Sequence, residues 1–187
     1  EDLPTPKPGH GEVLVRNQAL GVGWRDVLWR QSLSPDETAR LPAGVGFELA
    51  GVIEAVGPGV EDLAPGMPVA SFPAFSSNQY PAWGDLVLMP RRALTRYPDV
   101  LTPAEAAVHY TPYLLAYFAL VDLADVQPGQ RVLITEASHC LAPQAVQMAK
   151  ALGAEVIAST SDGSTRAYLR ELGADKVIDT EEQDLVL

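Results

Sequence analysis

Cysteine is almost absent from this chain of 187 residues, in which Cys140 is the only one. A single cysteine excludes an intramolecular disulfide and every zinc site that is built from several cysteines. The three histidines, His10, His109 and His139, stand far apart and show no metal-ligand spacing. The sequence therefore excludes a structural zinc site and argues against a catalytic metal.

Basic residues and long apolar runs are also scarce. Lys and Arg number 13 against 24 Asp and Glu, which gives a net charge of −11 and argues against binding to nucleic acid. No apolar run reaches the roughly 18 residues of a membrane span, and residues 1–4 lack the basic and apolar regions of a signal peptide. We therefore expect a soluble, cytoplasmic protein with neither nucleic acid nor a membrane as partner.

The first hundred residues are rich in proline and glycine. Their apolar segments are short and are bounded by Gly or Pro, as in 11–16, 46–56, 67–72 and 84–89. This pattern predicts a compact, largely antiparallel β-domain or barrel, with one short helix over 24–30.

From Thr102 onward the pattern changes. Thr102, Pro103 and Glu105 form the signature of a capped helix start, and the apolar stretch that follows predicts a helix to about residue 123, broken or kinked at Pro112. Predicted strands then alternate with predicted helices: strands at 131–135, 155–160 and 176–179, helices at 141–152 and 164–172. A β-α-β-α-β run of this kind is one half of a doubly wound parallel sheet, so the chain is predicted to be α/β.

The turn after the first parallel strand is where such folds bind phosphate. Residues 136–143 contain no glycine, so the Gly-x-Gly-x-x-Gly fingerprint is absent. Thr135, Ser138 and Ala142 are our candidate cofactor contacts, because small and hydroxyl side chains allow close approach of a phosphate. A purely structural turn is the alternative.

The end of the second parallel strand indicates which dinucleotide would bind. Ser159, Thr160, Ser161 and Arg166 favour the ribose 2′-phosphate of NADP, whereas Asp162 offers the carboxylate that holds the 2′-hydroxyl of NAD. On balance, the sequence favours NADP(H).

Four stretches resemble the zinc-independent, quinone-oxidoreductase-like branch of the medium-chain dehydrogenase/reductase superfamily. They are 8–16 with 21–26, 46–60, 127–135, and 147–154 with 172–179. The resemblance implies a GroES-like β-barrel domain (1–100) followed by a partial Rossmann domain (101–187), and NADPH-dependent reduction of a quinone or conjugated carbonyl. Where zinc-dependent relatives carry Cys and His ligands, this chain has Gly23 and Phe47.

Some positions depart from that family pattern. Gly23 stands where relatives usually have Asn near the nicotinamide, Leu115 where they often have Thr, and Ala142 where their phosphate turn ends in glycine. These departures suggest relaxed or altered cofactor binding. They support an alternative: a cofactor-independent relative that binds, isomerises or cyclises a small apolar substrate in the cleft between the domains. A non-enzymatic oligomerisation or scaffold module is a third interpretation.

Several single residues are candidates with a plainer alternative. His109, Tyr110 and Tyr80 are candidate proton donors, although core packing explains each of them as well. Cys140 beside His139 is a candidate reactive thiolate, whereas 181–184 is typical of a solvated acidic surface. The resemblance also implies a longer relative, so we expect either a fragment or a shortened form whose open sheet edge is closed in a homo-oligomer.

Overall fold

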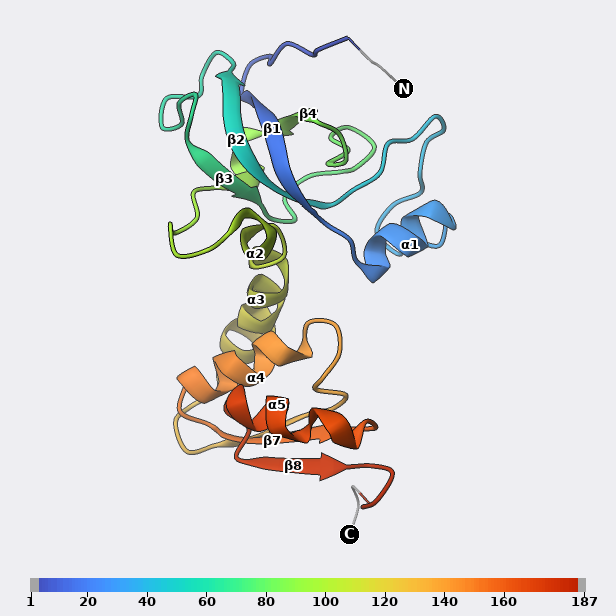
Figure 1. The fold of residues 1–187 in the computed structure, drawn as a ribbon, viewed down its shortest axis with the longest axis vertical. Helices are drawn as coiled ribbons and strands as arrows, with labels where there is room; N and C mark the ends of the chain where they lie inside the picture. Colours follow the sequence, from blue (N-terminus) through green and yellow to red (C-terminus); the bar gives the residue numbers. More distant parts are fainter. Residues whose placement is uncertain (1–3, 185–187) are drawn as a thin grey trace. The chain divides into compact units, whose positions relative to one another are not determined.

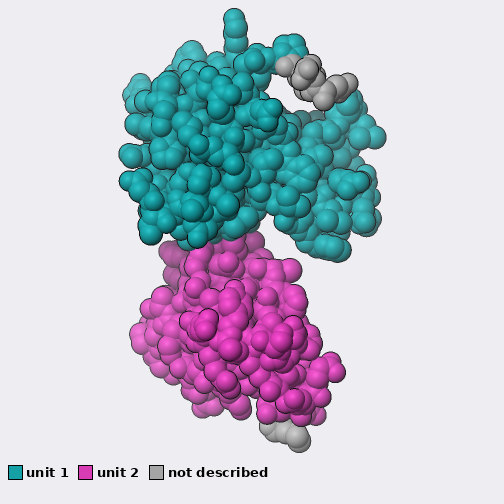
Figure 2. Space-filling view, viewed as in Figure 1, with its two compact units in different colours: residues 1–111 teal, residues 112–187 magenta. Residues whose placement is uncertain are grey.

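The computed structural model describes residues 4–184 of the chain. The chain forms two compact units, residues 1–111 (unit 1) and 112–187 (unit 2), which Figure 2 colours separately. Each unit has its own sheet, five-stranded in the first and three-stranded in the second. Among the described residues, no helix combines the length and apolarity that crossing a membrane requires.

Unit 1 is built on an antiparallel sheet with the strand order β4-β1-β2-β3-β5 (Figure 1). Irregularities in the β1–β2 register, between Leu14 and Val15 and between Asn17 and Ala19, are bulges of the kind that bend a strand. The predicted antiparallel β-domain is confirmed. The strands are β1 (Glu12–Gly21), β2 (Glu48–Val56), β3 (Pro68–Ser71), β4 (Leu86–Pro90) and β5 (Leu94–Thr95).

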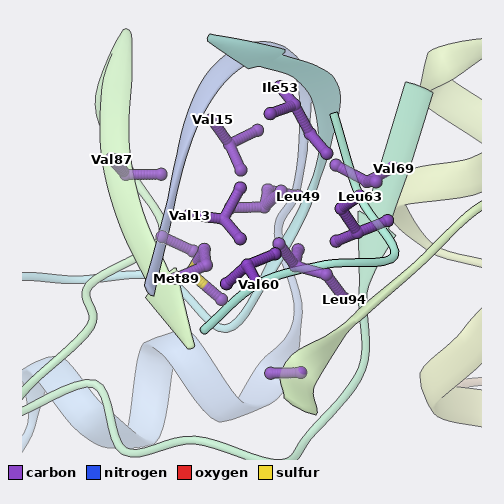
Figure 3. Packing of buried hydrophobic residues seen from close by; sticks show 12 residues of the cluster. Val13, Val15, Leu49, Ile53, Val60, Leu63, Val69, Val87, Met89 and Leu94 are labelled. Atoms are coloured by element: carbon purple, nitrogen blue, oxygen red, sulfur yellow. The ribbon is translucent and has the colours of Figure 1, made fainter. Parts of the chain in front are cut away.

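The core of unit 1 is formed by aliphatic side chains on the inner face of this sheet. Figure 3 shows the side chains of Val13, Val15 and Leu49 close together, and all three have no exposed surface. Val13 and Val15 lie two residues apart on β1, as the alternation of side chains along a strand requires. Burying each such side chain stabilises the fold by about 1.5–3 kcal/mol.

The short predicted helix of unit 1 is confirmed as α1 (Trp24–Arg30). Asp26 in its first turn accepts a hydrogen bond from the Gly23 amide at 2.8 Å, which satisfies one of the donors at the helix start. Trp29 is 2 % exposed and donates from Nε1 to the Gly44 carbonyl at 2.9 Å. These contacts fix α1 directly after the end of β1.

The predicted capped helix start is confirmed in α2 (Pro103–Ala107), where the Thr102 hydroxyl accepts from the Glu105 amide. The helix ends earlier than predicted, and a new one, α3 (Tyr110–Tyr117), follows before a π-helical stretch over Phe118–Leu123. The predicted break therefore lies just before Pro112, which stands in the first turn of α3. Its missing N–H is harmless there, because first-turn amides have no partner within the helix.

Unit 2 has a parallel sheet with the order β6-β7-β8, as the β-α-β-α-β pattern predicted. Gly153 and Gly173 have positive φ angles of 82° and 111° and follow the two helices, where glycine is favoured. The buried core joins one face of α4 to β7 through Val146, Ala149 and Val156. The elements are β6 (Arg131–Ile134), α4 (Ala142–Ala151), β7 (Glu155–Thr160), α5 (Arg166–Glu171) and β8 (Lys176–Asp179).

Candidate functional site

The turn between β6 and α4 of unit 2 makes its reversal without glycine. Glu136 and Cys140 take the left-handed conformation instead, with φ angles of 47° and 54°. The Ala137 amide donates to the Ser159 carbonyl at 2.8 Å, which ties the turn to β7. Among the described residues, none accepts a hydrogen bond from the amides of Ser138, Cys140 or Leu141. The turn thus offers amide donors at the carboxyl end of a parallel sheet, where anions bind in such folds.

A chain of hydroxyl groups joins this turn to the end of β7. Ser138 Oγ lies 3.2 Å from Thr160 Oγ1, and Thr160 Oγ1 lies 3.0 Å from Thr165 Oγ1. Thr160 is fully buried. The fold therefore brings together Ser138 and Thr160, two of the predicted cofactor residues, although 22 positions separate them in the chain.

The other predicted cofactor residues differ in what they present to a ligand. Thr135 and Ser161 are exposed, Ala142 is half-buried at the start of α4, and Ser161 donates to Glu136 Oε2 at 3.0 Å. Ser159 is 1 % exposed, and its carbonyl group accepts the hydrogen bond from the turn. A ligand at this edge would meet Thr135, Ser161 and Ala142 directly.

Asp162 and Arg166, the two charged residues predicted to bear on the choice of dinucleotide, both form hydrogen bonds within the protein. Asp162 accepts from the Ser164 amide at 3.0 Å, and hydrogen bonds from Ser164 hold the pKa of the Asp162 carboxyl below its ordinary value. Arg166 donates to Asp179 and to Glu182. Residues 181–184 are exposed, as predicted, and one of them, Glu182, also forms an ion pair with Arg166.

Cys140 is exposed at the same turn. The neighbouring His139 ring contacts other groups: its Nδ1 lies 3.0 Å from Ser138 Oγ and 3.8 Å from Glu136 Oε2. The left-handed backbone at Cys140 makes this residue a conformational element of the turn. The reactive thiolate stays a prediction.

In unit 1, the two positions that carry zinc ligands in the zinc-dependent branch are occupied by Gly23 and Phe47, neither of which can bind a metal ion. Phe47 is 4 % exposed and packs edge-on against Trp29, with the ring centroids 5.5 Å apart. The Arg25 guanidinium lies 4.0 Å from the centroid of the Phe47 ring, within the range of a cation–π contact. Among the described residues, no group of three or more His, Cys, Asp or Glu side chains could hold a metal ion.

Next to Phe47, the fold places a buried carboxyl group, Asp26, close to a half-buried one, Glu48, which the sequence did not predict. Asp26 is 4 % exposed, and its Oδ1 has no hydrogen-bond partner among the described residues. Burial raises the pKa of Glu48; a hydrogen bond from Thr111 and the charge of Arg25 act against this rise, and the charge of Asp26 adds to it. The position of Asp26 three residues after Gly23 was a usable signal, because an acidic residue there commonly caps a helix.

The three candidate proton donors lie in unit 1. The Tyr80 hydroxyl donates to Glu12 Oε1 at 2.9 Å, and the Tyr110 hydroxyl donates to the Arg96 carbonyl at 3.3 Å. The His109 ring packs edge-on against the Tyr110 ring, with centroids 5.1 Å apart. The fold thus pairs His109 with Tyr110 and gives Tyr80 a separate partner on β1.

A groove of about 570 Å³ on unit 1 runs along β4 and is lined by residues 4–6, 79, 81 and 83–88. None of the three candidate donors lines it. The groove therefore adds no partner to Tyr80, Tyr110 or His109.

In the comparison with known proteins, each unit matches the model of a dehydrogenase family. Residues 9–98 match the alcohol dehydrogenase GroES-like domain, and residues 142–186 match the family described as zinc-binding dehydrogenase. The pikromycin polyketide synthase component PikAII of Streptomyces venezuelae is 39 % identical over 171 residues, which are 91 % of this chain and 4 % of that protein.

Solved structures give the same result. The Escherichia coli quinone oxidoreductase, solved in complex with NADPH, has a TM-score of 0.84 at 27 % identity and is matched by 100 % of this chain. The CurK enoyl reductase also has a TM-score of 0.84, at 28 % identity over 96 % of this chain. The chain spans 55 % of each of these two structures. On the order of its motifs, its two sheets and these matches, the chain belongs to the quinone-oxidoreductase-like branch of the medium-chain dehydrogenase/reductase superfamily.

Proposed function

We propose that this chain is part of a zinc-independent, NADPH-dependent oxidoreductase that reduces a conjugated carbonyl or a quinone. The observation that carries the proposal is the turn after β6, where amides without a partner lie beside the Ser138 and Thr160 hydroxyls. Such a turn at the carboxyl ends of parallel strands fits the phosphates of a dinucleotide. The NADPH complex of the Escherichia coli relative supports this choice of cofactor.

The residues that would hold NADPH lie on one edge of the unit 2 sheet. Thr135, Ser138 and Ala142 would contact the phosphates, and Ser161 and Arg166 the adenosine ribose. Buried Ser159 and Thr160 would support them from behind. Bound NADPH supplies a hydride, so the remaining tasks of the protein are to hold the substrate and to deliver a proton.

For the proton, we propose Tyr80, Tyr110 and His109 as the candidates to test. Burial raises the pKa of the Tyr80 hydroxyl, with further contributions from its hydrogen bond to Glu12 and from the Glu12 charge, and burial alone raises that of Tyr110. Both tyrosines therefore keep their protons at neutral pH, which is the state that a donor requires.

Two observations support a substrate class: the residues at the two former zinc-ligand positions, and the names of the relatives. With Phe47 and Gly23 at the former ligand positions, no side chain there can bring a zinc ion to a carbonyl oxygen. A conjugated carbonyl compound suits this arrangement, because hydride addition to its carbon–carbon double bond requires only a proton as partner. The polyketide synthase and enoyl reductase relatives support an enoyl or enone compound as this substrate.

The test is a calorimetric titration of the chain with NADPH, using two matched variants on the same helix. Ala142→Glu places a carboxylate at the start of α4, beside the proposed phosphates, whereas Ala151→Glu places it at the far end. We expect Ala142→Glu to weaken binding about tenfold, since a carboxylate near a doubly charged diphosphate costs roughly 1–2 kcal/mol in water. Ala151→Glu should bind within about twofold of the unmodified chain.

Absence of NADPH binding by the unmodified chain would overturn the proposal. Equal weakening by both variants would remove the turn from the site. The same titration separates this function from a cofactor-independent activity, which would show no binding of NADPH at all.

A further inference from the structure

Arg166 is held by two carboxylates of very different character. Its Nη2 donates to Asp179 Oδ2 at 2.7 Å and also to Glu182 Oε2. The Asp179 side chain is 5 % exposed, whereas the Glu182 side chain is 65 % exposed. An incoming ligand can therefore displace only Glu182, the exposed partner.

Asp179 is fixed by its surroundings. Its Oδ1 accepts from the Glu181 amide at 3.0 Å, and it ends β8 in register with Thr160. A Cβ at Gly163 would lie 2.4 Å from Asp179 Oδ2, so the missing side chain of Gly163 is what lets the carboxylate approach the turn. Asp179 is therefore the permanent partner of Arg166.

Glu182 belongs to the exposed turn after β8, and its ion pair with Arg166 is the kind that contributes little to stability. Its hydrogen bond is nevertheless the largest influence that raises the pKa of the Arg166 guanidinium. A ribose 2′-phosphate would seek the same guanidinium, because Arg is the usual partner of that group.

Two further carboxylates lie near this edge. Asp162 lies on the turn between β7 and Arg166, and Glu136 accepts a hydrogen bond from Ser161. Asp179 and Glu182 are the two carboxylates that bind Arg166, and Asp162 and Glu136 add negative charge on the neighbouring turns. A 2′-hydroxyl finds acceptors here, whereas a 2′-phosphate is repelled unless it can replace one carboxylate.

We propose that Glu182 sets the discrimination between NADPH and NADH, because its carboxylate occupies the guanidinium of Arg166 that a 2′-phosphate must reach. This inference rests on the proposed nucleotide site in unit 2. It assigns to Glu182 the role of an internal competitor that a 2′-phosphate displaces and a 2′-hydroxyl leaves in place. Glu182 is thus a specificity residue and takes no part in hydride transfer.

The test compares Glu182→Gln with Glu181→Gln, which removes the same charge from the neighbouring exposed position. Calorimetry with adenosine 2′,5′-bisphosphate and with adenosine 5′-monophosphate probes the adenosine end alone. We expect Glu182→Gln to tighten the bisphosphate about fivefold, since a unit charge near a doubly charged phosphate at moderate salt has an effect of that order. The monophosphate should change less than twofold in either variant, and the bisphosphate less than twofold in Glu181→Gln.

Two outcomes would overturn the inference. If the monophosphate binds but Glu182→Gln and Glu181→Gln have the same effect on the bisphosphate, Glu182 does not compete and the proposed nucleotide site stands. If neither nucleotide nor NADPH binds the unmodified chain, the nucleotide site itself is wrong and the role of Glu182 falls with it.

Discussion

Gly51 in the middle of β2 is a position where a single added methyl group should strongly destabilise unit 1. It pairs with Asn17 on β1. A Cβ at Gly51 would lie 2.2 Å from the carbonyl oxygen of Arg16 and 2.9 Å from the Cα of Asn17. Both atoms belong to the backbone of β1, which pairs with β2 and β4, so neither can move without disturbing strand pairing.

The expected cost can be set against ordinary overpacking. Inserting a methylene into a core costs about 1–3 kcal/mol when side chains adjust. Here two paired strands must separate, so we expect Gly51→Ala to lower the free energy of unfolding of unit 1 by about 3 kcal/mol or more. With an m value of roughly 2 kcal/mol/M, the urea midpoint should fall by about 1.5 M.

Tryptophan fluorescence provides the assay, because Trp24, Trp29 and Trp83 all lie in unit 1 and are the only three tryptophans of the chain. Gly23→Ala is the control, since its new Cβ would meet only Asp26 Oδ2 at 3.9 Å. We expect the control to lose no more than about 1 kcal/mol, the usual effect of alanine at a helix N-cap. Equal midpoints for the two variants would refute the reasoning.

Two further predictions concern the half-buried carboxyl group of Glu48 and the left-handed backbone of Cys140. Burial gives Glu48 a raised pKa in the folded state, so unit 1 should lose stability as pH rises from the ordinary value of 4.5 through the raised one. Glu48→Gln removes that loss: melting temperatures should match the unmodified chain near pH 4 and exceed it near pH 8, and a gap that is the same at every pH would contradict this assignment. Because Cys140 has a φ of 54°, Cys140→Gly should stabilise unit 2 by about 1 kcal/mol, whereas Cys140→Val should destabilise it. Thermal unfolding followed by far-UV circular dichroism tests this, and a Cys140→Gly variant that melts below the unmodified chain would show that the turn is not strained.

Much of the fold was predictable because its signals are local. The predicted limits of α1, β7 and β8 coincide with the structure, since apolar runs between Gly, Pro and capping residues define short elements well. The two-residue strand β5 (Leu94–Thr95) was missed because so short a segment has no periodicity. A break at Pro112 was predicted, and the structure places it a few residues earlier, because α2 ends at Ala107.

The candidate site was only partly predictable. Ser138 and Thr160 were proposed separately from the strand ends on which they lie, and the parallel pairing of β6 with β7 brings them within 3.2 Å. The sequence also suggested Arg166 as a phosphate ligand. It gave no sign that Glu182 would take that guanidinium, because the pair depends on the turn after β8 folding back toward α5.

The sequence by itself determined the family, the order of elements and the exclusion of a cysteine-based metal site. These properties follow from residue identities and from patterns within short windows, which local backbone geometry imposes. Only the tertiary structure decided which charges meet: Asp26 with Glu48, and Arg166 with Asp179 and Glu182. Electrostatic interactions depend on distance and burial, which strand register and turn conformation set between residues far apart in the chain.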